Sequence, residues 1–209
     1  MEAVPEFQSF SSIARLYREV VVTEKIDGTN ACVHVLDDGR VLAASRTRYI
    51  TPEDDNFGFA AWVKANESEL RAGLGIGRHY GEWWGAGIQR RYGLTDKRFS
   101  LFNTGRWGEG FGPQGADPRV PPTALVMPPS CCLVVPVLYR GVFDSERVEH
   151  CLIDLTIDGS RAAPGFANPE GVVVYHTAGN LYFKSTLPDD GHKHAGRAKS
   201  VASNLEARK

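Results

Sequence analysis

The sequence predicts an α+β domain in which mostly antiparallel strands are flanked by a few helices. Short β-branched runs recur along the chain, two pairs of them are spaced as hairpins, and only two segments carry helical signals. Apolar residues make up 42% and charged residues 23% of the 209 residues, as expected for a globular chain with a core. No internal repeat is visible, so we expect one domain over residues 1–190 and a basic tail over residues 191–209.

The N-terminal third is expected to hold a strand, a hairpin and a helix. The run Glu19–Lys25 (EVVVTEK) is β-branched and short, as in a buried strand. Residues Asn30–Leu36 alternate in polarity, the turn Asp37–Arg40 follows, and Val41–Ser45 returns as the second strand of a hairpin. Apolar residues at helical spacing predict a helix over Phe57–Leu74.

The middle of the chain is expected to hold three more strands. Two are predicted over His79–Trp84 and Phe99–Asn103, and Gly105–Pro122 is rich enough in glycine and proline to form a long surface loop. The run Cys132–Arg140 is typical of a buried strand. Pro136 within it cannot donate a backbone hydrogen bond, so we expect an edge position or a bulge there.

The C-terminal part is expected to hold a helix, a hairpin and the tail. Ser-Glu-Arg-Val-Glu opens a capped helix over Ser145–Leu155. A second hairpin is predicted from Val172–His176 to Leu181–Ser185. The tail, residues 191–209, carries five Lys or Arg against one Glu. Neutralising backbone phosphates is the usual use of such charge, so we expect the tail to grip nucleic acid.

Composition excludes several classes of protein. The formal net charge of −1 gives no global basic field, so contact with a phosphate backbone must come from a local patch. No apolar run approaches the roughly 18 residues that span a bilayer, and residues 1–10 do not form a signal peptide. The four cysteines form no CxxC pair and are expected as free thiols in a reducing compartment, which places the protein in the cytoplasm.

The heptapeptide Glu24-Lys25-Ile26-Asp27-Gly28-Thr29-Asn30 is the strongest candidate for chemistry. Lys25 ends an apolar strand, and Gly28 lets the backbone approach a ligand closely. A lysine becomes a nucleophile only when neutral, which costs an ordinary side chain roughly 4 kcal/mol near neutral pH. Nearby cations or desolvation lower that cost. On these residues alone, a surface lysine before a turn remains an equal interpretation.

Five further segments follow this heptapeptide at suggestive spacings. They are Ser45-Arg46-Thr47-Arg48, the segment Gly81-Glu82-Trp83-Trp84-Gly85-Ala86-Gly87-Ile88-Gln89, Phe102 twenty positions after Glu82, Glu170-Gly171-Val172-Val173-Val174, and Leu181-Tyr182-Phe183-Lys184. Together with Lys-x-Asp-Gly at Lys25, their order and content resemble the covalent nucleotidyltransferases, which include DNA ligases, RNA ligases and capping enzymes. Thr29-Asn30 and the Gly-Ile-Gln segment resemble the RNA ligase branch in particular. The resemblance covers Lys25 to Lys184.

The resemblance implies an ATP-dependent RNA ligase that joins 5′-phosphate and 3′-hydroxyl ends, in the repair of nicks or breaks. AMP would be carried first on a lysine and then on the 5′-end, with Mg²⁺ or Mn²⁺ as the metal. The substrate would be RNA or an RNA-containing nicked duplex. The implied roles are Lys25 as nucleophile, Glu24, Arg46 and Glu82 as nucleotide ligands, Phe102 as the adenine platform, Glu170 as a metal carboxylate, Asn30 as a metal ligand through water, Lys184 on the α-phosphate, and Arg48, Lys193, Arg197 and Lys199 on nucleic acid.

Two features depart from the family pattern. The last of these family segments, here Leu181-Tyr182-Phe183-Lys184, normally offers two lysines separated by one residue, and Tyr182 stands in the first place. We expect Lys193 to supply the second cation. Only 25 residues follow Lys184. That is too few for an appended oligonucleotide-binding barrel or helical domain, so we expect a nucleotidyltransferase domain nearly on its own. An unidentified partner protein could supply a substrate-binding domain.

Other interpretations stay open at this point. The chain could be a DNA nick ligase, which Gly-Ile-Gln argues against, or an adenylylated end-binding or regulatory protein that does not complete sealing. His192-Lys193-His194 could be a metal site or a solvated loop. Taken singly, the candidates also have structural explanations: Phe102 as core, Glu82 as an exposed strand residue, Glu170 as a turn cap, Arg46 as a surface ion-pair partner and Lys184 as a solvated strand end. Oligomeric state does not follow from the sequence.

Overall fold

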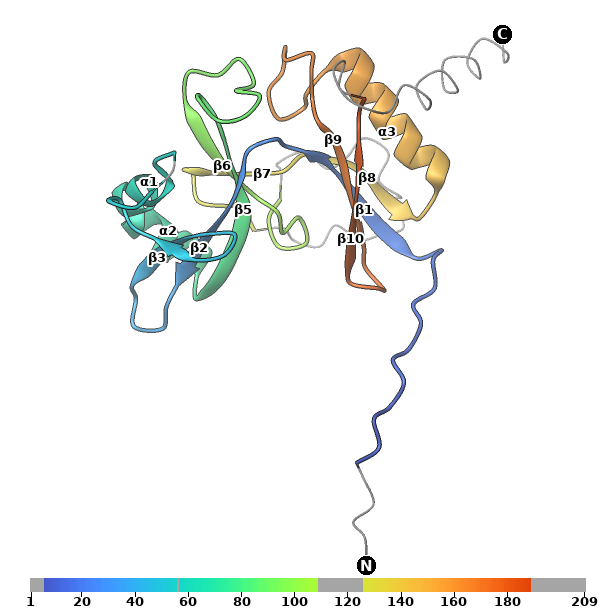
Figure 1. Ribbon diagram of the computed structural model, residues 1–209, viewed down its shortest axis with the longest axis horizontal. Helices are drawn as coiled ribbons and strands as arrows, with labels where there is room; N and C mark the ends of the chain where they lie inside the picture. The colour runs from blue at the N-terminus through green and yellow to red at the C-terminus, as the bar shows by residue number, and fades with distance from the viewer. Residues whose placement is uncertain (1–5, 56, 109–125, 189–209) are drawn as a thin grey trace, which may run out of the picture.

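Two sheets lie side by side, and the first strand of one leads directly into the other (Figure 1). The computed structural model describes residues 6–55, 57–108 and 126–188. One sheet has four strands in the order β10-β9-β1-β8, and the other has six in the order β4-β3-β2-β5-β6-β7. Every strand pair is antiparallel except β6 with β7. The structure has the mostly antiparallel strands and the few helices that the sequence predicts.

The four-stranded sheet places one face against a single long helix. Its strands are β1 (Glu19–Lys25), β8 (Val137–Val142), β9 (Gly171–His176) and β10 (Leu181–Thr186). Helix α3 (Ser145–Asp158) begins after Asp144, whose carboxylate accepts a hydrogen bond from the Glu146 backbone N–H. Side chains of β1, β9 and α3 form the core between them, namely Val20, Val22, Cys151, Leu155, Val172 and Val174. The opposite face of this sheet carries Lys25.

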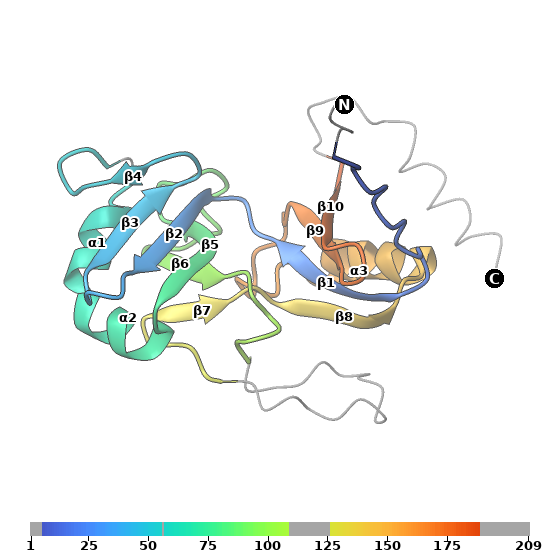
Figure 2. The ribbon, with the colours of Figure 1, turned by 90° about the horizontal axis from the view of Figure 1, so that it is seen from below.

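The six-stranded sheet is covered on one face by two short helices (Figure 2). Its strands are β2 (Thr29–Val35), β3 (Val41–Ser45), β4 (Tyr49–Ile50), β5 (Gly77–Gly85), β6 (Lys97–Leu101) and β7 (Cys132–Val134). Helices α1 (Phe59–Ala65) and α2 (Glu67–Leu74) pack on alternate side chains of these strands. Because side chains alternate across a strand, the other set faces away from the helices.

A third cluster of buried side chains joins the two sheets. Ile26 leaves β1, Trp84 belongs to β5 and Val135 connects β7 to β8. The Tyr92 ring packs edge-on against Trp84, with ring centroids 4.9 Å apart. The end of β1 is therefore fixed from both sheets.

Most predicted elements are confirmed, with two corrections. The helix expected over residues 57–74 is two helices, because Asn66 leaves helical geometry and both its backbone N–H and its side-chain amide donate to the Trp62 carbonyl oxygen. The strand expected over residues 132–140 is divided at Val135 and Pro136 into β7 and β8, which belong to different sheets. Most of the predicted loop 105–122 lies outside the described residues. No described helix is long and apolar enough to cross a membrane.

Candidate nucleotide-binding active site

Lys25 is the last residue of β1, and its side chain meets Glu170 from the neighbouring strand. Lys25 pairs with Gly171, the first residue of β9, so Glu170 comes directly before that position. The Lys25 Nζ and Glu170 Oε2 atoms are 2.6 Å apart. The Lys25 side chain is 24% exposed. The register of β1 with β9 thus brings together two residues that are 145 positions apart in the sequence. The Lys25 side chain stays partly exposed in this arrangement.

Glu24 lies on the opposite face from Lys25 and is held by the segment that follows α3. Its carboxylate accepts hydrogen bonds from Ser160 Oγ at 2.6 Å, from the Arg161 N–H at 2.7 Å and from the Ala162 N–H at 2.8 Å. The residue is 1% exposed. Burial raises the pKa of Glu24, and these hydrogen bonds act against that shift. The Glu24 side chain therefore braces the strand that carries Lys25. The expected contact of Glu24 with the nucleotide stays a prediction.

Removing that brace is expected to destabilise the fold. A Glu24→Ala variant would leave the Ser160 hydroxyl and two backbone N–H groups without their acceptor in a buried place, at a cost of about 2–4 kcal/mol. Urea unfolding followed by circular dichroism measures the loss. Ser68→Ala, on helix α2, is the control and should unfold like the wild type. A Glu24→Ala protein as stable as the wild type would contradict the bracing role.

The turn after Lys25 is fixed by residues of the β5–β6 connection. Tyr92 Oη accepts a hydrogen bond from the Asp27 N–H at 2.7 Å. The Arg90 guanidinium donates to Asp27 Oδ2 at 3.0 Å and to the Asn168 carbonyl oxygen at 3.3 Å. Arg90 thus links a residue two positions from Lys25 to one two positions from Glu170. Sequence analysis missed this contact, although Arg90 directly follows the Gly-Ile-Gln segment.

Glu82 faces the same turn from the six-stranded sheet. Its two carboxylate oxygens accept hydrogen bonds from the Gly28 N–H and from Asn30 Nδ2, each at 3.0 Å. Burial raises the pKa of Glu82 to about 7, against the opposing effect of these hydrogen bonds. A Cβ on Gly28 would lie 2.5 Å from the Trp83 carbonyl oxygen. Only glycine allows this close approach of the turn to β5.

Phe102 lies just beyond β6, on the face that carries Glu82. Glu82 pairs with Ser100, and Phe102 is two residues further along the chain. Its backbone N–H donates to the Tyr80 carbonyl oxygen. The residue is 38% exposed and belongs to none of the three core clusters. The structure therefore excludes the core interpretation and leaves the ring open for stacking.

Loss of the Phe102 ring is expected to weaken nucleotide binding without unfolding the protein. Stacking on an aromatic side chain contributes roughly 1–3 kcal/mol per base. Phe102→Ala should therefore raise the apparent KM for ATP in self-labelling about tenfold or more, whereas Phe102→Tyr should restore it. Thermal unfolding of both variants controls for folding. If the KM of Phe102→Ala equalled that of the wild type, Phe102 would not be part of the nucleotide site.

Three of the remaining candidates lie at exposed positions. Lys184 pairs with Val173, which pairs with Thr23, so Lys184 shares its sheet face with Lys25. Arg46 follows directly after β3, whose last residue pairs with the neighbour of Asn30. Arg48 is instead ion-paired with Asp54, with Nη2 and Oδ1 2.9 Å apart. Lys193, Arg197 and Lys199 lie outside the described residues.

Tyr182 does not take over the function of a lysine in β10. Its ring stacks on Tyr175 with centroids 4.6 Å apart, and the side chain supplies no positive charge. Burial raises the pKa of Tyr182, which keeps the phenol neutral. Lys184 is accordingly the only lysine among the described residues of this hairpin.

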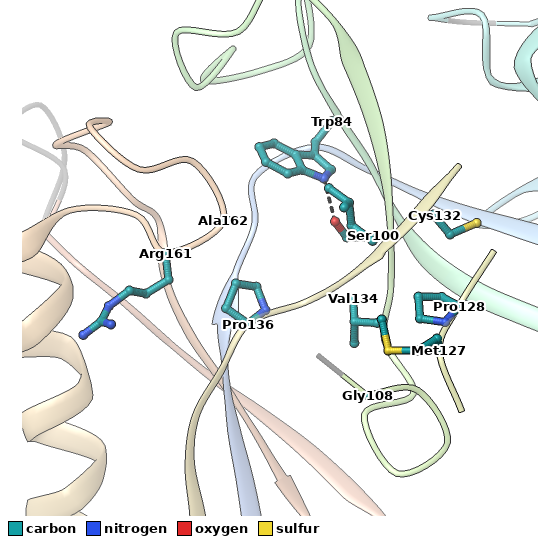
Figure 3. Close-up of a pocket in the computed structure, with 11 residues that line it drawn as sticks. Trp84, Ser100, Gly108, Met127, Pro128, Cys132, Val134, Pro136, Arg161 and Ala162 are labelled. Carbon is teal, nitrogen blue, oxygen red and sulfur yellow. Dashed lines mark hydrogen bonds between the residues drawn. The ribbon is translucent and has the colours of Figure 1, made fainter. Parts of the chain in front are cut away.

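A cavity of about 290 Å³ adjoins the site beneath the end of β1 (Figure 3). Trp84 and Ser100 line one side, and Trp84 Nε1 donates to Ser100 Oγ at 2.9 Å. Arg161 and Pro136 line the other side, and the Pro136 carbonyl oxygen accepts from the Glu24 N–H at 2.9 Å. Lys25, Glu82, Glu170 and Lys184 are not among the residues that line this cavity.

The side chains around Lys25 offer few ligands for a metal cation, so most ligands of a bound cation would come from water and from the substrate. No group of three or more His, Cys, Asp or Glu side chains that could hold a metal occurs among the described residues. Glu170 offers a single carboxylate beside the amine. Mg²⁺ commonly binds through one or two carboxylates and completes its shell with water and substrate phosphates. Glu170 could therefore serve such an ion, and a metal site built from protein ligands alone is not present in these ranges.

Comparisons with known proteins agree with this geometry. The RNA ligase family profile matches residues 18–186. A solved structure of a Naegleria gruberi RNA ligase variant in its apo form is 19% identical, with a TM-score of 0.52, over 88% of this chain and 57% of that chain. Another variant of that ligase, solved with ATP and Mn, is 18% identical, with a TM-score of 0.55, over 82% of this chain and 50% of that one.

The chain spans little more than half the length of these ligase structures. No curated protein sequence matches it. The structural likeness supports the fold, and the family match covers every motif from the strand that carries Lys25 to the strand that carries Lys184. On that match, the chain belongs to the RNA ligase family.

Proposed function

We propose that this protein is an ATP-dependent RNA ligase that joins 5′-phosphate and 3′-hydroxyl ends through a covalent lysyl-AMP. The observation that carries the proposal is the accessible Lys25 amine beside Glu170, at the strand end that Glu82 approaches from the other sheet. The Naegleria gruberi ligase solved with ATP and Mn has the same fold, which supports ATP and a divalent cation as ligands here. The family match supports RNA as the substrate.

The reaction would proceed in three phosphoryl transfers. In the first, the Lys25 amine attacks the α-phosphorus of ATP, the bond to the β-phosphate oxygen breaks, pyrophosphate leaves and the nitrogen loses a proton. In the second, a 5′-phosphate oxygen attacks the same phosphorus and the lysine leaves. In the third, a 3′-hydroxyl attacks the phosphorus of the activated 5′-end and AMP leaves. Positioning and charge neutralisation carry most of the catalysis in such transfers.

Glu170 has two tasks in this scheme. In the structure it pairs with the Lys25 side chain and so holds the nucleophile at the end of β1. Attack requires the neutral amine, because the ammonium has no lone pair. Glu170 is the carboxylate that would hold a divalent cation, and the chemistry such a cation supplies when bound is neutralisation of the phosphate charge. Glu170 would thus orient Lys25 before the reaction and serve the cation during it.

The other residues would bind and orient the nucleotide. Glu82 would accept hydrogen bonds from the ribose hydroxyls, and Asn30, which donates to Glu82, would position a water of the cation. Phe102 would stack on adenine from the open face of the six-stranded sheet. A guanidinium binds oxyanions with two parallel donors, which suits Arg46 to a phosphate. Lys184, on the face of Lys25, would contact the α-phosphate.

One observation favours a second candidate function. Tyr182 stands where the family pattern has a lysine, so one positive charge near the α-phosphate is missing from β10. A protein that becomes adenylylated but does not seal ends would tolerate that loss. The chain would then act as an adenylylated end-binding or regulatory protein.

A nick-sealing assay separates the two functions. The protein is incubated with ATP labelled at the α-phosphate and with nicked duplexes that carry RNA or DNA on either side of the nick. A ligase should label itself and then convert RNA-containing nicks to joined strands. Stable label on the protein with no joined product from any duplex would favour the end-binding function. Equal sealing of all-DNA nicks would favour a DNA nick ligase.

A further inference from the structure

The open face of the six-stranded sheet carries a row of aromatic side chains beyond the nucleotide site. Tyr49 pairs with Ala44, Ala44 with Cys32 and Cys32 with Tyr80. Residues directly opposite in antiparallel pairs share a face. Tyr49 is 50% exposed and Tyr80 is 58% exposed, and the Tyr80 carbonyl oxygen accepts from the Phe102 N–H. The row therefore continues to Phe102, the expected adenine platform.

Arg78 and His34 lie in the next row of the same face. Arg78 pairs with His34, two residues along each strand from Tyr80 and Cys32. Interaction with the Tyr49 hydroxyl raises the pKa of Arg78. The Tyr49 hydroxyl and His34 Nδ1 are 2.7 Å apart, and the two rings are stacked at 11° with centroids 6.0 Å apart. These contacts hold Tyr49 and Arg78 in fixed positions before any ligand arrives.

The composition of this face suits a nucleic acid better than a protein. Small side chains, Ala44 and Cys32, separate the two tyrosines, so the row is a set of spaced rings and lacks a continuous apolar patch. Among the described residues, neither of these two rows contains an Asp or Glu. Glu82 pairs with Asn30 in the row on the other side of the aromatic row, and it is buried. Exposed rings at intervals beside a guanidinium are the features that bind unpaired bases and their phosphates.

We propose that Tyr49, Tyr80 and Arg78 form a track for a single-stranded segment of RNA that leads to the nucleotide site. Bases would stack on the Tyr80 and Tyr49 rings, and Arg78 would contact the phosphate between them. The inference rests on the proposed function for the identity of its ligand, because that function makes RNA the substrate. It adds a binding surface on residues that no motif of the family resemblance contains.

The test measures the binding of a short fluorescent single-stranded RNA by anisotropy, without ATP, over a range of salt concentrations. Tyr80→Ala is expected to weaken binding about tenfold, and Tyr80→Phe to bind like the wild type because the ring remains. Arg78→Gln is expected to weaken binding and to lower the slope of log affinity against log salt by about 0.7, since one phosphate contact is lost. A fully paired RNA duplex of the same length should show no dependence on Tyr80.

Two variants elsewhere serve as matched controls. Tyr17→Ala removes a 73% exposed ring from the segment before β1, and Arg71→Gln removes a guanidinium from α2, on the covered side of the sheet. Both should bind RNA like the wild type. Wild-type affinity in Tyr80→Ala and Arg78→Gln, or equal losses in the two controls, would overturn the proposal. So would a parallel loss of ATP-dependent self-labelling in Tyr80→Ala, which would place the ring in the ATP site.

The outcome is separable from the proposed function, since RNA binding without ATP needs no covalent chemistry. A wild-type protein that never labels itself, but binds single-stranded RNA through Tyr80, would refute the ligase proposal and support the track. A protein that seals nicks but whose affinity for RNA does not depend on Tyr80 would support the ligase proposal and refute the track.

Discussion

A Lys25→Arg variant is expected to lose all detectable transfer of AMP to the protein. The guanidinium stays protonated under any practical condition and has no free amine to attack the α-phosphorus. The variant keeps a positive charge beside Glu170. An arginine at this position can therefore form an ion pair with Glu170 in place of the Lys25–Glu170 pair, and folding should be little affected. Incubation with α-labelled ATP and Mg²⁺, followed by denaturing electrophoresis, measures the transfer.

The matched control for this variant is Lys64→Arg, on the exposed side of helix α1. It makes the same chemical change away from the site and should be labelled like the wild type. Labelling of Lys25→Arg at the wild-type level would show that another residue is the nucleophile.

A Glu170→Gln variant is expected to lose activity by orders of magnitude while its thermal stability changes little. Glutamine keeps the shape of the side chain and can still accept a hydrogen bond from Lys25, but it removes the charge that would serve the cation. The backbone bond from the Leu187 N–H to the Glu170 carbonyl oxygen does not depend on the side chain. Initial rates of self-labelling over a range of Mg²⁺ concentrations test this expectation.

Glu149→Gln, at an exposed position of α3, is the control for loss of one carboxylate. Its labelling rate should follow that of the wild type. If Glu170→Gln reacted normally even at low Mg²⁺, the carboxylate would have no role with the cation, and its pairing with Lys25 would be structural only.

The strands are predicted well from the sequence because the signals for a strand and for a hairpin turn lie in neighbouring residues. The β-branched run of β1 and the two hairpins depend on nearest-neighbour pairing and turn residues. Pro136 predicts an edge position or a bulge, and both β7 and β8 are edge strands of their sheets. The passage of the chain from one sheet to the other at this point was not predicted. Whether a strand bends within one sheet or passes to another depends on packing around it, here the cluster that holds Val135.

The candidate site was predicted in its residue types but not in its contacts. The resemblance to the covalent nucleotidyltransferases implied Lys25, Glu82 and Glu170, and the register of β1 with β9 explains how the segments of Lys25 and Glu170 meet. The opposite orientation of Glu24 follows from strand alternation, yet its acceptor role needs the loop after α3. The link from Arg90 to the Lys25 turn depends on tertiary contacts and carries no sequence signal beyond its position after Gln89.

The most direct test of the account is the mass of the protein after incubation with ATP and Mg²⁺, followed by peptide mapping. The account predicts the addition of one AMP in an acid-labile bond, located on the peptide that contains Lys25. It also predicts that added pyrophosphate reverses the modification, because the first transfer is reversible. An unmodified protein under conditions that support folding, or an AMP mapped to any other residue, would contradict the central claim.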